Sequence, residues 1–216
     1  MHEFATRGAG TPLPYDPPTK LVTSGPYAYV ANPMQIAATL ILLVLASALH
    51  SWWIAGAGVI AHVYSTGVAA WDEHDDLTSR FGERWATYRH EVHDWIPRWR
   101  PWIYEPATLY VSATCEMCSE VKRWFEGRGS VGLQIVEAER SPRPLHRLTY
   151  VHANGSSEEG VVAIARALEH LHLGWAYIGW GMRLPLVHQA LQLLVDAVGG
   201  GARTLATNGV SQSVAQ

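Results

Sequence analysis

The sequence predicts an α-helical hairpin that spans a membrane, followed by a small α/β domain. The first observation is that no Asp, Glu, Lys or Arg occurs between Lys20 and Asp72. The second is a change after about residue 105, where short β-type segments alternate with helical spacing. The third is that the two cysteines, Cys115 and Cys118, lie between the first of these strands and the helix that follows it.

Two apolar runs form the predicted hairpin, at residues 34–50 and 52–71. Each is close to the length of about 20 residues that a helix needs to cross a bilayer core. Trp52, Trp53 and Trp71 lie at the ends of the second run, and membrane interfaces favour such aromatic rings. The alternative is a helical hairpin buried inside a soluble protein.

The segment before the hairpin is predicted to be extended. Residues 1–20 are rich in Gly, Pro and Thr, and they lack the pattern of a secretory signal peptide. Pro33 suits the first turn of a helix, with Asn32 as its N-cap. The hairpin is therefore expected to begin at this Asn-Pro pair.

Charge predicts the orientation of the hairpin. The turn between the two runs has no Lys or Arg, whereas five arginines follow the hairpin: Arg80, Arg84, Arg89, Arg98 and Arg100. Because positive charge collects on the cytoplasmic side, we expect an integral membrane protein with both termini in the cytoplasm. The net charge of −3 gives no reason to expect a nucleic acid partner.

A polar helix is predicted at residues 72–93, interrupted by Gly82. Its acidic start, Asp72 to Asp76, is interpreted as a solvated face rather than a metal site, because adjacent helical residues point in different directions. We therefore predict no metal. A boundary near residue 105 separates a membrane domain at 1–104 from a second domain at 105–203, and residues 204–216 are predicted to be disordered.

The second domain is predicted to contain strands at 107–113, 133–139 and 146–155. A helix is expected directly after Cys115, and another from about residue 156, where Ser precedes acidic residues and an apolar run. A last helical region extends to about residue 198. This order of elements indicates a mixed α/β domain.

The Cys-x-x-Cys pair is the strongest local motif. A thiolate at a helix N-terminus is stabilised by exposed N–H groups and the helix dipole. Cys115 could then attack a disulfide and Cys118 could resolve the intermediate. Zinc binding is less favoured, because no second cysteine pair or well-spaced histidine pair follows. The remaining alternative is two cysteines without a chemical role in a helix cap.

Residues 107–203 resemble the DCC family of thioredoxin-like thiol–disulfide oxidoreductases. The resemblance rests on LYVSATCEMCSEVKRWF, on the polar turn NGSSEEGVVAIARAL and on a C-terminal region rich in Trp, Gly and Pro. It implies a thioredoxin-like fold, catalytic roles for Cys115 and Cys118, and a thiol or disulfide partner protein. The family usually has Asp and Gly where this chain has Ser112 and Ala113.

Residues 8–100 resemble the isoprenylcysteine carboxyl methyltransferases and phospholipid methyltransferases of membranes. The matching text is GTPLPYDPPTKLVTSGPYAYVANPMQ, the apolar hairpin and WDEHDDLTSRFGERWATYRHEVHDWIPR. The resemblance implies S-adenosylmethionine as cofactor. By position, the residues that it implies for cofactor binding are Tyr29, Asn32, Pro33, Gln35, Glu73 and His74.

This chain departs from that family at several of these positions. The family commonly has Arg-His-Pro-x-Tyr where Ala31-Asn32-Pro33-Met34-Gln35 stands here, and a second Glu where His74 stands. It also usually has membrane spans before the GTPxPxDPP stretch. Membrane lipid and another membrane subunit that supplies further spans are therefore expected partners.

Three functions remain open at this point. The first is a methyltransferase-like membrane protein fused to a thiol–disulfide oxidoreductase-like domain. The second is a membrane-tethered thiol–disulfide oxidoreductase with an inactive methyltransferase half. The third is a non-catalytic assembly or scaffold subunit that keeps both folds.

Overall fold

The structure is a computed structural model that describes residues 3–11 and 17–201. The chain divides into two compact units, Met1–Arg98 and Trp99–Gln216, and each is described by itself. The tail predicted to be disordered, residues 204–216, lies outside the described residues.

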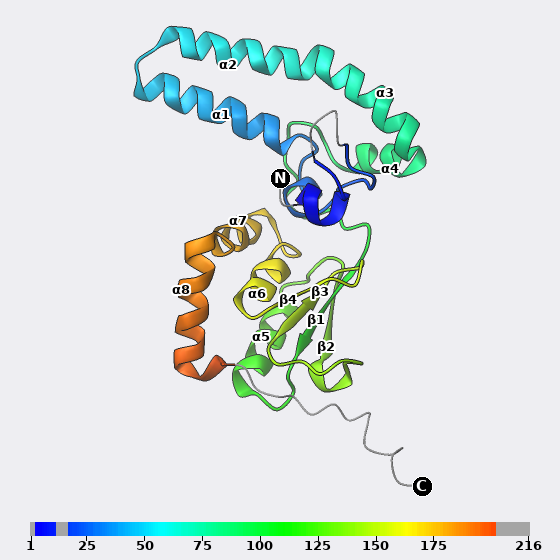
Figure 1. The fold of residues 1–216 in the computed structure, drawn as a ribbon, viewed down its shortest axis with the longest axis vertical. Coiled ribbons are helices and arrows are strands. Elements are labelled where there is room, and N and C mark those ends of the chain that lie inside the picture. The colour runs from blue at the N-terminus through cyan, green and yellow to red at the C-terminus, as the bar shows by residue number, and fades with distance from the viewer. Residues whose placement is uncertain (1–2, 12–16, 202–216) are drawn as a thin grey trace. The chain divides into compact units, whose positions relative to one another are not determined.

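The regular elements in the described part of unit 1 are all helical, and irregular segments join them (Figure 1). Its main helices are α1 (Pro33–Ala48), α2 (Trp52–Tyr64), α3 (Ala70–Phe81) and α4 (Glu83–Glu91), with shorter turns at Phe4–Gly8, Gly25–Ala28 and Ser65–Ala69. Figure 1 shows α1 and α2 as a hairpin of two helices side by side. The predicted start is confirmed, because Asn32 is the N-cap residue and Pro33 opens the helix.

The predicted transmembrane hairpin is wrong. α1 has 16 residues and α2 has 13. At a rise of about 1.5 Å per residue these helices are about 24 and 20 Å long, less than the roughly 30 Å of a bilayer core. The first run ends early because His50 takes a positive φ of 50°. The second passes into a π-helical turn at Ser65–Ala69. In the described residues, no helix combines the length and apolarity that crossing a membrane requires.

Gly82 separates α3 from α4, as predicted. Its φ is +51° and its ψ is −124°, a backbone conformation that residues other than glycine rarely adopt. The turn lets α4 bring Trp85 and Tyr88 into the buried part of unit 1. The Tyr88 hydroxyl donates to the carbonyl of Tyr27 at 2.8 Å, which joins α4 to the turn before α1.

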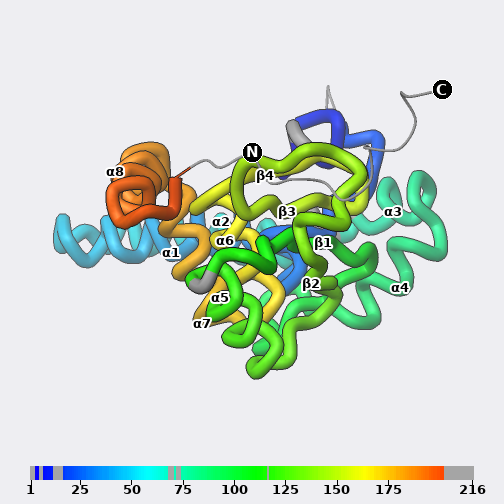
Figure 2. The backbone as a smooth tube through the Cα atoms, turned by 90° about the horizontal axis from the view of Figure 1, so that it is seen from below, coloured from blue at the N-terminus to red at the C-terminus, as the bar shows by residue number. Residues whose placement is uncertain are grey.

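Unit 2 holds a four-stranded sheet and four helices in its described part (Figures 1 and 2). The strands are β1 (Ala107–Val111), β2 (Leu133–Glu137), β3 (Thr149–Val151) and β4 (Ser157–Glu159). The helices are α5 (Glu116–Glu126), α6 (Val161–Leu168), α7 (Leu173–Met182) and α8 (Pro185–Val195), with a short 3-10 turn at Ala138–Arg140.

The sheet order is β2-β1-β3-β4. β1 and β2 are parallel, with Val111 opposite Glu137, while β3 is antiparallel to both β1 and β4. Parallel neighbours need a crossover, and here α5 makes it. The residues that follow β1 and the residues that follow β2 therefore leave the sheet at the same edge.

The core of unit 2 lies between the sheet and its helices. In Figure 2, α5 and α6 lie on the same side of the strands. Leu109 of β1, Phe125 of α5 and Ala167 of α6 are among the buried residues that meet there. Alternate residues of β1 are buried, as expected for a strand that turns one face to a core.

The segment at residues 156–160 differs from the prediction. The sequence predicts a helix from about residue 156, but Ser157–Glu159 forms β4 and α6 begins at Val161. The reason is the turn before it. Gly155 has a φ of +83° and the His152 N–H donates to the Ser156 carbonyl at 2.8 Å, so the chain folds back on β3.

Candidate functional site

The Cys pair lies where the sequence places it, between a strand and a helix. Cys115 is the N-cap residue of α5, in extended conformation, and its carbonyl accepts the Ser119 N–H at 3.0 Å. Cys115 and Cys118 are both half-buried. Cys118 packs against the core of unit 2, so its side chain is backed by apolar groups.

The loop before Cys115 is held by the carboxylate of Glu139, which lies in the 3-10 turn after β2. The Ser112 hydroxyl donates to Glu139 Oε1 at 3.0 Å. The Ala113 N–H lies 3.1 and 3.2 Å from the two oxygens of the same carboxylate. Ser112 and Thr114 are also joined to each other, with their hydroxyl oxygens 3.1 Å apart. These hydrogen bonds fix the residues before Cys115.

The Glu139 carboxyl is held in its ionised form. Burial raises the pKa of Glu139, but hydrogen bonds from its own N–H and from Ala113 outweigh that effect. The Ser112 hydroxyl and the Thr114 N–H lower the pKa further, so it lies below the ordinary value. A negative charge therefore stands beside the Cys115 loop at neutral pH.

Aromatic side chains pack together near the C-terminal end of α5. The rings of Trp124 and Trp175 meet edge to face at 4.9 Å, and the Arg128 guanidinium lies 3.8 Å from the centre of the Trp124 ring. These contacts cover the far end of the helix that carries the thiols.

The predicted cofactor residues of unit 1 begin at the turn before α1. Tyr29 is fully buried, and its carbonyl accepts the Arg98 N–H at 2.8 Å. The Ala31 N–H donates to the His93 carbonyl at 2.9 Å, and the Asn32 N–H donates to the Asp94 carbonyl at 3.3 Å. The turn is therefore paired with the segment that follows α4.

The Asn32 side chain does not cap α1. Its amide donates to Asp94 Oδ1 at 3.5 Å, and Asp94 is in turn bound by both terminal nitrogens of the Arg89 guanidinium. This arrangement joins an amide, a carboxylate and a cation at the N-terminal end of α1. Asp94 and Arg89 were not predicted as site residues, although the segment WATYRHEVHDWIPR, on which the resemblance rests, contains both.

The other predicted positions lie on two helices. Gln35 is half-buried in the first turn of α1. The His74 ring, on α3, accepts the Trp85 indole N–H at Nδ1, at 3.3 Å. Glu73 belongs to α3, but its side chain lies outside the described part of the structure. Trp85 also contacts Arg89, whose guanidinium lies 5.3 Å from the centre of the Trp85 ring.

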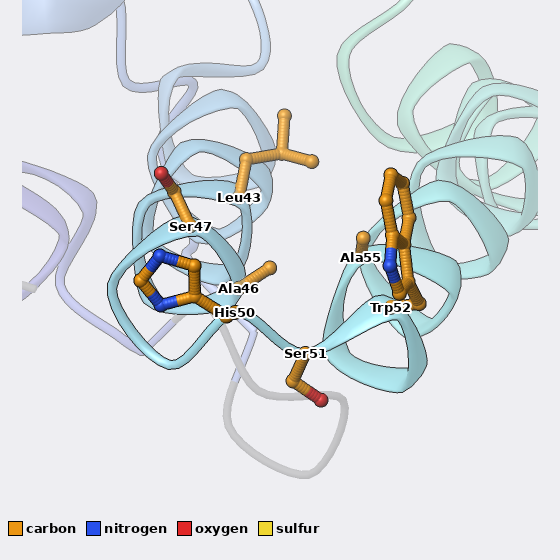
Figure 3. A pocket seen from close by; sticks show the side chains of 7 residues that line it. All are labelled: Leu43, Ala46, Ser47, His50, Ser51, Trp52 and Ala55. Atoms are coloured by element: carbon orange, nitrogen blue, oxygen red, sulfur yellow. The ribbon is translucent and has the colours of Figure 1, made fainter.

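A pocket of about 350 Å³ lies at the other end of α1 (Figure 3). Figure 3 shows His50, Ser51 and Trp52 at the turn, with the remaining side chains on α1 and α2. The lining residues are Leu43, Ala46, Ser47, His50, Ser51, Trp52 and Ala55. It contains none of the predicted cofactor residues.

The polar groups around Asn32 fit one part of S-adenosylmethionine. The amino-acid end of that molecule carries a carboxylate and an ammonium group. Arg89 and Asp94 pair with each other here, and on binding the guanidinium would be a partner for the carboxylate and Asp94 a partner for the ammonium. The Asn32 amide stands beside both. The residues present therefore fit the amino-acid end of this cofactor.

Residues 9–84 match the phospholipid methyltransferase family. Methyltransferases of that family generally use S-adenosylmethionine, and the family is membrane-associated. Comparison with curated proteins and with solved structures gave no match. No comparison supports the resemblance of residues 107–203 to DCC oxidoreductases.

Proposed function

We propose that unit 1 binds S-adenosylmethionine at the N-terminal end of α1 and serves in methyl transfer. The family match over residues 9–84 supports the cofactor, and the Arg89–Asp94 pair, which lies outside that match and beside Asn32, supports the place of binding. Arg89 and Asp94 would hold the amino-acid end of the cofactor, with the Asn32 amide beside them. When bound, S-adenosylmethionine would supply the methyl group of its sulfonium to an amine or carboxylate. The protein would contribute largely by positioning the two reactants.

The test is equilibrium binding of S-adenosylmethionine to the purified full-length protein. Asp94→Asn should weaken binding about tenfold, because it removes the charge that would pair with the ammonium. Asp76→Asn is the matched control, since Asp76 pairs with Arg80 on the exposed side of α3. Absence of binding at millimolar cofactor would contradict the proposal.

Unit 2 has a second candidate function, thiol–disulfide exchange by Cys115 and Cys118. The observation that favours it is the position of Cys115 at the N-cap of α5, directly after the β1 loop. The Cys115 thiolate attacks a partner disulfide and forms a mixed disulfide, releasing one partner thiolate. The Cys118 thiolate then attacks the Cys115 sulfur and releases the second. The pair is oxidised to a disulfide, and the partner takes up two electrons and two protons.

Reduction of insulin disulfides by the full-length protein tests this exchange. Cys115→Ser should abolish it. Cys118→Ser should retain the first attack and accumulate a mixed disulfide, so the two variants differ in a defined way. If reduction is unchanged in Cys115→Ser, the redox proposal fails.

The expected partners follow from these two activities. A membrane lipid and a further membrane subunit belong to the methyltransferase proposal, and a thiol or disulfide protein belongs to the redox proposal. A protein that neither binds S-adenosylmethionine nor exchanges disulfides would instead be a non-catalytic scaffold. The two assays above separate these cases.

A further inference from the structure

Glu139 reaches the Cys115 loop from the turn that follows the neighbouring strand β2. β1 and β2 are parallel with Val111 opposite Glu137, so the residues after both strands emerge at the same edge of the sheet. The 3-10 turn Ala138–Arg140 then directs Glu139 at the loop after β1. Its carboxylate accepts from Ser112 and Ala113, 27 and 26 residues away in the sequence.

In the described residues, no ion pair with a side chain of the Glu137–Arg140 segment neutralises the Glu139 carboxylate. Glu137 and Arg140 flank it, but they pair with each other at 3.1 Å. The groups that face it from the β1–α5 loop are hydroxyls and backbone N–H groups, which carry no charge. The Thr114 N–H also donates to it, and Thr114 immediately precedes Cys115. Cys115 is the next titratable residue along that loop, and Glu116, Cys118 and Glu120 follow it on α5.

We infer that Glu139 is a positioning residue for the redox pair: it fixes the Ser112–Thr114 loop and disfavours the Cys115 thiolate, which makes the pair a reductant rather than an oxidant. The inference rests on the proposed thiol–disulfide exchange. A fixed negative charge close to a thiol raises the free energy of the thiolate relative to the thiol. The carboxylate belongs to the turn after β2 and not to the loop that carries the thiols.

The direction of the redox effect follows from the two oxidation states. A strongly oxidising pair is one whose reduced form is stabilised, chiefly as a thiolate at a helix N-terminus. Glu139 opposes the stabilisation of the thiolate. The disulfide carries no charge, so the carboxylate has little effect on it. The disulfide form is therefore relatively favoured, and the pair gives up its electrons more readily.

The experiment measures alkylation of Cys115 by iodoacetamide against pH, in the full-length protein carrying Cys118→Ser. The chain has two cysteines, so the reaction then reports on Cys115 alone. Glu139→Gln should move the midpoint of the profile down by about one pH unit, because it removes the charge and keeps an acceptor oxygen. Glu139→Asp should restore the wild-type midpoint. Glu137→Gln, two residues away, is the matched control and should leave it unchanged.

In the intact Cys pair, Glu139→Gln should raise the reduction potential. A purely structural role for Glu139 predicts the opposite pattern: a midpoint that is unchanged or raised in Glu139→Gln, and that Glu139→Asp fails to restore. Either result would overturn the inference. Amide protection of α5 in each variant establishes that the helix is intact, and Glu139→Asp keeps the test valid if Glu139→Gln is unfolded.

The alkylation test does not depend on disulfide exchange, so the two failures can be told apart. Loss of insulin reduction in Cys115→Ser with no shift in Glu139→Gln would refute the role of Glu139 alone. A shift in Glu139→Gln without any disulfide exchange would refute the proposed function of the pair.

Discussion

Arg166 of α6 is only 1% exposed, yet it carries a full charge. Its Nε and Nη2 donate to the two oxygens of Glu158 at 2.8 and 3.2 Å, and its Nη1 lies 3.4 Å from both oxygens of Glu169. Arg183 adds a second cation at 2.8 Å from Glu169. Each buried charge of this cluster therefore has an oppositely charged partner. Without such a partner, a buried charge is strongly destabilising.

Replacing Arg166 by Met should destabilise unit 2 by about 3–5 kcal/mol, because two carboxylates would be left without their buried partner. The free energy of unfolding of unit 2, obtained by urea denaturation, measures this loss of stability. Arg140→Met is the control: Arg140 also pairs with a glutamate, but its side chain is 73% exposed. Its cost should stay below about 1 kcal/mol. Equal costs for the two variants would mean that burial does not strengthen the Arg166 pairs.

The same cluster predicts how stability depends on pH. Burial raises the pKa of Glu158, but hydrogen bonds from His152 and Arg166 outweigh it and hold the pKa far below the ordinary 4.5. A lowered pKa means that the stabilisation is present above pH 4.5 and is lost as the pH falls below it. Amide protection factors in α6 should therefore decrease from pH 5 toward about pH 3. In Glu158→Gln this decrease should be smaller, and an unchanged decrease would contradict the assignment.

At the scale of elements, the junction of α3 and α4 depends on one glycine. A Cβ at Gly82 would meet no atom within 4 Å, so the cost of Gly82→Ala is purely in the backbone conformation. We expect about 1–3 kcal/mol of destabilisation. Gly56→Ala, in the open middle of α2, should instead stabilise by about 0.5–1 kcal/mol. Thermal unfolding of both variants measures this difference in sign, and a stabilising Gly82→Ala would refute the backbone argument.

At the scale of the whole molecule, each unit has its own buried residues. Leu109 is fully buried in the core of unit 2, so Leu109→Ala should cost about 2–5 kcal/mol there. Hydrogen exchange should show faster exchange in β1 and β3, with α4 of unit 1 unchanged. Leu193→Ala, at a position 72% exposed, is the matched control and should change neither. Faster exchange in α4 would show that the two units unfold together.

Several elements could be predicted because their signals are local. Asn32-Pro33 marks the start of α1, Gly82 separates two helices, and Cys115 caps α5 directly after a β-type run. Pro33 and Gly82 have restricted or unusual backbone freedom, which acts on their immediate neighbours. The predicted spans failed because apolar composition does not state where a helix ends. The positive φ of His50 and the π-helical turn after Tyr64 decide that.

The sequence by itself determined where the thiols lie, where α1 begins and where α3 breaks, since these depend on neighbouring residues. Only the tertiary structure decided which groups surround them. Glu139 reaches the Cys115 loop through the parallel register of β1 and β2, and Asp94 reaches Asn32 across 62 residues. Ser157–Glu159 is a strand because β3 lies beside it. Pairing between distant segments is set by packing of the whole unit, and no local pattern in the sequence encodes it.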